Sequence, residues 1–244
     1  MQLATSNEET LISHIEALRK MLLKCVIVTA LLYPAGFLLT PYAIRGLVQW
    51  SFPESIDKLY YFAPMEVLWV QLKLGLIIAL VMAYPWNIRQ VWHFLLPALY
   101  RNERKALGWW IFFSSCLFFS GVAFCLWLVL PLMMDFSGGF ATSELQPMLG
   151  LAHFLNLACM MMFAFGILFQ SPIIVFVCVR FGLISPDALA KKRPYIMTAI
   201  LILSGILTPP DVVSQLMLAI PTWLLFELGL FVSGWLKRKS DMKR

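Results

Sequence analysis

One carboxylate set among cations is the group in this chain best suited to recognising a positively charged ligand. Glu103 lies in the stretch WHFLLPALYRNERK (residues 92–105), between two long apolar runs and beside the cations Arg101, Arg104 and Lys105. Because such charges are costly in lipid, we expect the stretch to face water. The stretch also contains three aromatic side chains, which favour the level of the lipid headgroups: Trp92, Phe94 and Tyr100. Glu103 is therefore a candidate for binding incoming cations; the alternative is a solvated partner of its neighbouring arginines, which would contribute little to stability.

Further polar side chains lie inside apolar runs, where they are expensive unless they are paired or functional. Glu66 and Lys73 are two helical turns apart and share one face, which predicts an ion pair or a water-lined recess. Gln170 precedes Pro172 at an expected bend, and Glu227 lies within the last apolar run. For the charged residues, a structural pairing role and a transport role both remain open.

The chain lacks the residue patterns of an enzyme or a metal site. It contains no HExxH motif and no phosphate-cradling loop, and its histidines are scattered: His14, His93 and His153. Its five cysteines all lie in apolar segments and form no CxxC pair. We therefore predict no catalytic residues, no metal and no cofactor.

Composition identifies an integral membrane protein, since 61% of the residues are hydrophobic, 13% are charged and the mean hydropathy is +0.81. The net charge of +6 does not indicate nucleic-acid binding, because its cations gather in alternate segments. They precede the first apolar run, follow the second and the fourth, and end the chain, whereas the intervening loops hold only Arg45 and Lys58. This asymmetry predicts that both termini are cytoplasmic.

Hydropathy predicts an all-α membrane protein with one domain, residues 1–244, and outer loops at 41–64 and 131–150. Its six spans are expected at about 21–40, 65–85, 106–130, 151–179, 195–207 and 212–235. The fifth span rises only roughly 18 Å against a hydrocarbon core of roughly 30 Å. With the sixth span it should form a shallow hairpin, beside which the lipid thins or another helix packs. Bends are expected near Pro34 and Pro221.

Several motifs together resemble the TatC family, the multi-spanning receptor component of the twin-arginine protein-export system. They are PALYRNERK, AFGILFQSP, KKRPY, and TPPDVVSQLMLAIP followed by LFELG. The resemblance implies a glove-shaped, six-helix protein of the bacterial inner membrane, with both termini cytoplasmic. It also implies binding of signal peptides that carry paired arginines, and assembly with further copies and with the single-span partners TatA and TatB. Folded proteins are then exported by the proton-motive force, without an enzyme activity.

The resemblance also implies which residues bind the signal peptide. Glu103 matches the acid of the first cytoplasmic loop, and Phe94 and Arg19 belong to the same site. The family's N-terminal pattern H-x-x-E-L-R reads HIEALR here, so Ala17 replaces the usual acid and Glu16 comes one residue early. One residue rotates a helical side chain by about 100°, which makes Glu16 a weaker candidate.

Two other positions bear on assembly. Gln170 stands where the family commonly has Glu, and its amide cannot carry a charge. The family's docking region for TatA and TatB corresponds to the short hairpin, with Thr208 and Gln215 as polar contacts. Their alternative roles are a local turn and an internally satisfied amide.

Two alternative functions remain as hypotheses from the sequence. Glu66, Lys73 and Glu227 within apolar runs would suit a proton- or ion-coupled small-molecule transporter, although the chain shows no matching broken helices in two halves. A purely structural scaffold would need partners but no peptide affinity.

Overall fold

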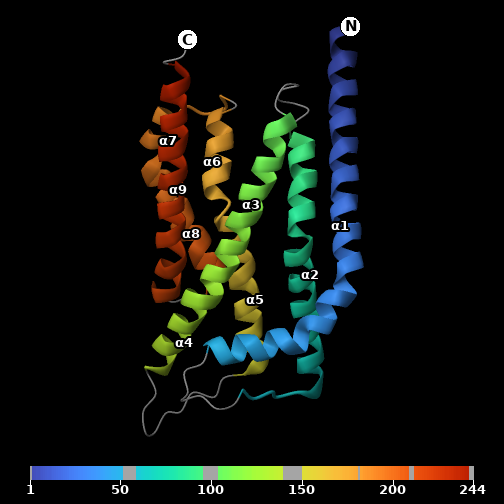
Figure 1. Ribbon diagram of the computed structural model, residues 1–244, viewed down its shortest axis with the longest axis vertical. Coiled ribbons are helices and arrows are strands. Elements are labelled where there is room, and N and C mark those ends of the chain that lie inside the picture. Colours follow the sequence, from blue (N-terminus) through green and yellow to red (C-terminus); the bar gives the residue numbers. More distant parts are fainter. Residues whose placement is uncertain are drawn as a thin grey trace. The chain divides into compact units, whose positions relative to one another are not determined.

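The computed structural model describes residues 2–51, 59–95, 104–139, 150–180, 182–208 and 212–241. Every regular secondary-structure element within these ranges is a helix. One isolated β-bridge pairs Tyr60 with Gly150. The predicted all-α class is confirmed (Figure 1). The chain divides into two compact units, Met1–Pro41 with Gln71–Ser115, and Tyr42–Val70 with Cys116–Arg244.

The first two helices are longer than the sequence predicts. Helix α1 (Gln2–Ser51) continues past Pro34 and Pro41, and α2 (Pro64–Leu95) continues past Pro85. The predicted loop from residue 41 is therefore helical as far as Ser51, and α2 extends beyond the predicted end of the second span near Pro85; the span bounds stay predictions. Proline removes one helical hydrogen bond, but a membrane-spanning helix tolerates this loss where neighbouring groups satisfy the freed carbonyl.

The third span also extends beyond its predicted end. Helix α3 (Arg104–Phe124) passes into a π-helical segment (Cys125–Val129) and then into α4 (Leu130–Gly138). In this wide turn Leu130 N–H donates to the carbonyl of Cys125, five residues earlier. Because Pro131 has no N–H to donate, the wider turn lets the chain continue as a helix where a loop is predicted.

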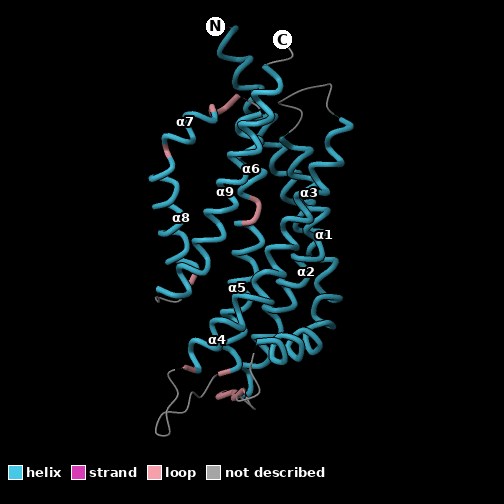
Figure 2. The backbone as a smooth tube through the Cα atoms, turned by 60° about the vertical axis from the view of Figure 1, so that its left-hand side comes forward, coloured by secondary structure: helices cyan, strands magenta, loops and turns pink. Residues whose placement is uncertain are grey.

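The fourth span is broken where the sequence predicts a bend. Helix α5 (Leu151–Leu168) ends before a turn at Phe169 and Gln170, and α6 (Ser171–Arg180) follows. Figure 2 shows the break as a loop between the two helices. Pro172 lies in the first turn of α6, where its missing N–H is not required.

The closing elements are α7 (Pro186–Lys191), α8 (Arg193–Leu207) and α9 (Val212–Asp241). By length and composition, five helical segments can cross a membrane: Ser13–Ser51, Pro64–Phe94, Gly108–Phe136, Leu151–Arg180 and Val212–Trp235. Helix α8 has 15 residues and rises roughly 22 Å, so the predicted short fifth span is present as a short apolar helix.

Close backbone contact joins α1 and α2 within the first unit, where they lie side by side (Figure 1). A Cβ atom on Gly36 would lie 2.5 Å from the carbonyl oxygen of Gly75 and 3.0 Å from the amide nitrogen of Ala79. Asn87 Nδ2 also donates to Thr29 Oγ1 at 3.4 Å. Small residues permit this approach, which places the beginning of α1 beside the end of α2.

In the second unit, glycines again lie where two helices pack closely. A Cβ on Gly121 of α3 would lie 2.6 Å from the carbonyl oxygen of Phe165 in α5. One on Gly229 of α9 would lie 2.7 Å from Cα of Pro172 in α6. A buried cluster joins α6, α7 and α9: Val175, Leu189, Phe226 and Leu230.

Candidate functional site

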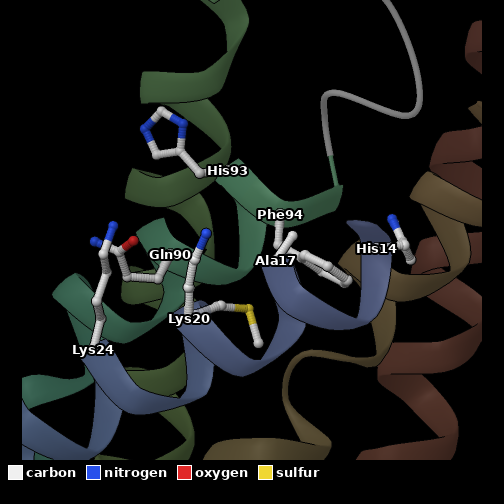
Figure 3. Close-up of a pocket in the computed structure, with 8 residues that line it drawn as sticks. His14, Ala17, Lys20, Lys24, Gln90, His93 and Phe94 are labelled. Atoms are coloured by element: carbon white, nitrogen blue, oxygen red, sulfur yellow. The ribbon is translucent and has the colours of Figure 1, made fainter. Parts of the chain in front are cut away.

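A pocket of about 470 Å³ lies between the beginning of α1 and the end of α2, within the first unit (Figure 3). The residues from α1 recur every three or four positions, so they form one face of that helix: His14, Ala17, Lys20, Met21 and Lys24. Those from α2 share a face for the same reason: Gln90, His93 and Phe94.

The pocket walls combine cations and hydrogen-bond donors with apolar groups. Lys20 and Lys24 of α1 project toward the same side as Gln90 and His93 of α2 (Figure 3). The rings of His14 and Phe94 lie with their centroids 4.7 Å apart. No Asp or Glu belongs to the described residues that line this pocket, so Lys20 and Lys24 give that described lining a positive charge.

Of the residues predicted to bind a signal peptide, Phe94 lines the pocket; Ala17, which replaces the family's usual acid, also forms part of its wall. Glu16 and Arg19 lie on the same stretch of α1 but do not line it. The Glu16 side chain is 65% exposed, and its carboxylate lies 4.0 Å from the amino group of Lys20. Glu16 therefore lies one helical step from Ala17, which lines the pocket, and its role in binding the signal peptide stays a prediction. Glu103 lies outside the described residues.

Six pocket residues are not predicted as site residues from the sequence: His14, Lys20, Met21, Lys24, Gln90 and His93. The helical spacing of the cations with His14 and Ala17 would have indicated one shared face. The spacing does not show that this face meets the end of α2, because the sequence predicts that the second span ends near Pro85.

Glu66 caps helices in the second unit. Its carboxylate accepts hydrogen bonds from the backbone N–H groups of Phe62 at 2.9 Å and Ala63 at 3.2 Å, the two residues that precede α2. It also accepts one from Ala152 N–H, in the first turn of α5, at 3.3 Å. These contacts support the structural role over the transport role, and an ion pair with Lys73 stays a prediction.

Glu227 and Gln170 also make contacts within the second unit. Arg193, at the start of α8, donates to Glu227 Oε2 of α9 at 2.8 Å. The pair joins the predicted hairpin and accounts for the arginine of the KKRPY motif. Gln170 is 9% exposed and lies at the α5–α6 break, where its backbone carbonyl accepts from Ile174 N–H at 3.0 Å.

Thr208 and Gln215, the predicted docking residues, both have partners inside the hairpin. Thr208 Oγ1 donates to the carbonyl of Ser204 at 2.8 Å, and Gln215 Nε2 donates to the carbonyl of Leu201 at 2.9 Å. Gln215 therefore ties α9 to α8. Among the residues whose positions are described, no three His, Cys, Asp or Glu side chains gather as a metal site would require.

Comparison with known proteins gives one consistent result. The family described as Sec-independent protein translocase protein (TatC) matches residues 13–221. A TatC of Haemophilus influenzae is 34% identical, with 96% of this chain and 92% of that protein covered. A TatC of Escherichia coli K12 is also 34% identical, with coverages of 95% and 90%.

Solved structures show the same likeness. A crystal structure of the twin arginine translocase receptor TatC in DDM superposes with a TM-score of 0.84 at 29% identity, covering 90% of this chain and 99% of that one. A second crystal structure of this receptor superposes with a TM-score of 0.82 at 30% identity, covering 91% and 98%.

Proposed function

Because the chain belongs to the TatC family of Sec-independent protein translocases, and is thus a multi-pass translocase component and not an enzyme, we propose that it is the signal-peptide receptor of its complex. In this proposal it binds twin-arginine signal peptides at the cytoplasmic face of the bacterial inner membrane. Together with TatA, TatB and further copies of itself, it exports folded proteins with energy from the proton-motive force.

The observation that carries the proposal is the exposed Glu16 carboxylate beside the α1–α2 pocket. Its contact with Lys20 is long, at 4.0 Å, and the two side chains are 65% and 75% exposed. Exposed pairs of this kind contribute about 0–1 kcal/mol. An incoming guanidinium can replace the lysine at little cost, because it forms a shorter, bidentate contact with a carboxylate.

Glu103 is the proposed second carboxylate. It follows the end of α2 by only eight residues, and α2 carries Phe94 into the pocket wall. Two carboxylates would suit two consecutive arginines, whereas paired lysines would lose the bidentate geometry.

The test is the affinity of a twin-arginine signal peptide for the purified full chain, compared with Glu16→Gln and Glu103→Gln. Each change removes a charge-assisted contact and should weaken binding roughly ten- to a hundredfold, since such hydrogen bonds contribute about 1.5–3 kcal/mol. A paired-lysine peptide should bind weakly to all forms.

Asp187→Asn is the matched control, because it removes an exposed acid from the first turn of α7 that does not belong to the lining of this pocket. Its affinity for the peptide should equal that of the parent chain. Unchanged binding in both glutamate variants would remove these carboxylates from the site.

We further propose that the α8–α9 hairpin docks a single-span partner, with Thr208 and Gln215 at the contact. Gln215→Leu removes the bond to Leu201 and should lower both TatB co-purification and hairpin stability, the latter by about 1 kcal/mol. Gly205→Ala is the control, since its Cβ would lie 3.2 Å from Gln215 Nε2 and disturb the bond without removing the amide. If Gln215→Leu leaves co-purification unchanged, the docking assignment is wrong.

A further inference from the structure

We propose that the pocket between α1 and α2 binds the phosphate of an anionic phospholipid headgroup. This occupant is separate from the signal peptide, and the inference stands whether or not Glu16 and Glu103 read paired arginines.

The charge of the pocket selects an anion. Its described lining contains two ammonium groups, two imidazole rings and one amide, without a carboxylate. A doubly cationic peptide segment placed inside would be repelled by Lys20 and Lys24, whereas a phosphate would accept hydrogen bonds from both. The nearby Glu16 opposes an anion only weakly, because it lies outside the lining and is well exposed to solvent.

The donors come from both walls of the pocket. Lys20 and Lys24 are one turn apart on α1, and Gln90 and His93 are one turn apart on α2 (Figure 3). A phosphate between them can therefore be contacted from two sides. The volume of about 470 Å³ is within the range of roughly 300–1,000 Å³ that is typical of small-molecule sites.

The apolar part of the pocket indicates a lipid in preference to free phosphate. Ala17, Met21 and Phe94 line it beside the cations, which suits the glycerol and first methylenes of a phospholipid. The pocket also lies at one end of two segments that are long and apolar enough to cross a membrane, Ser13–Ser51 and Pro64–Phe94. Leu18, Leu22 and Leu23, also on α1, are exposed as lipid-facing residues would be. Basic pockets between helices on the cytoplasmic side favour anionic headgroups.

The experiment is native mass spectrometry of the full chain, released from micelles that contain defined fractions of phosphatidylglycerol or phosphatidylcholine. The parent chain should retain phosphatidylglycerol in preference to phosphatidylcholine. The double variant Lys20→Gln/Lys24→Gln should bind phosphatidylglycerol on the order of 25-fold more weakly, since each cation near an anionic lipid contributes roughly fivefold. Lys20→Arg/Lys24→Arg should keep the affinity because both charges remain.

Lys191→Gln/Lys192→Gln is the matched control, because it removes the same charge from exposed positions outside the pocket. Equal losses in the two glutamine variants would reveal only general surface attraction and would overturn the proposal. So would equal retention of the two lipids, or displacement of phosphatidylglycerol by millimolar inorganic phosphate, which would identify a free-anion site.

A twin-arginine peptide, tested against the same variants, separates this proposal from the receptor function. Intact peptide binding with lost lipid binding in Lys20→Gln/Lys24→Gln supports a dedicated headgroup site. Intact lipid binding with lost peptide binding would assign the pocket to the peptide and overturn the inference.

Discussion

At the scale of single residues, the site depends on which of two neighbouring positions carries an acid. Ala17 lines the α1–α2 pocket, whereas Glu16 lies one helical step away and contacts Lys20 on the exposed side. The sequence predicts this displacement, because 100° per residue is a property of any α-helix. It does not predict the cationic lining, since that depends on α2 reaching His93 and Phe94.

Ala17→Glu should change the selectivity of the pocket. A carboxylate here would face Lys20 and Lys24, neutralise part of the positive charge and offer a bidentate contact to a guanidinium. We expect twin-arginine peptides to bind roughly tenfold more tightly in a direct binding titration. Ala17→Gln, of similar size but neutral, should show less than half of this gain in free energy; an equal gain would show that charge is not the cause.

At the scale of elements, prolines explain most of the differences between predicted and observed helices. The break at Gln170 was predicted correctly, because Pro172 follows it in the next turn. Pro41, Pro85 and Pro131 do not end their helices. Local sequence cannot separate these cases, since a helix continues through proline only when tertiary neighbours or a wider turn satisfy the freed groups.

Gly36→Ala should weaken the packing of α1 on α2. Its new methyl group would meet the backbone of Gly75 and Ala79, which cannot rotate away, and overpacking of this kind costs about 1–3 kcal/mol. Thermal unfolding in detergent measures the loss. Gly46→Ala in the same helix has no atom within 4 Å of its new Cβ and should be neutral or slightly stabilising through helix propensity. Equal unfolding temperatures for the two variants would contradict the close contact.

At the scale of the whole molecule, hydropathy predicts the class and the number of apolar segments, because long apolar helices are hard to mistake. Five of the six predicted spans correspond to segments long enough to cross a membrane, and α8 is the short one. Orientation rests on the placement of cations in alternate segments, which composition reveals without a structure. Exact helix ends, and side-chain pairs such as Arg193 with Glu227, cannot be predicted without the three-dimensional structure.

Labelling with a membrane-impermeant thiol reagent should test the orientation. In a chain without its native cysteines, Glu103→Cys should react only in inside-out vesicles, and Glu144→Cys only in intact spheroplasts, because alternate loops face opposite sides. Both should react after detergent is added, which controls for thiol reactivity. Reaction of position 103 from outside alone would reverse the assigned cytoplasmic face and remove the proposed receptor site.

The π-helical segment Cys125–Val129 has a consequence for aligning this chain with its relatives. Up to its first residue, the buried residues follow one face: Phe118, Gly121, Val122 and Cys125. From its last residue on, they are Val129, Leu130, Met133 and Met134, displaced by about 100° on a wheel of 3.6 residues per turn. That displacement equals one inserted residue, which the wide turn absorbs so that both halves keep their buried side. A relative with a regular helix here should have one residue fewer, and an alignment without that gap would match buried positions to lipid-facing ones.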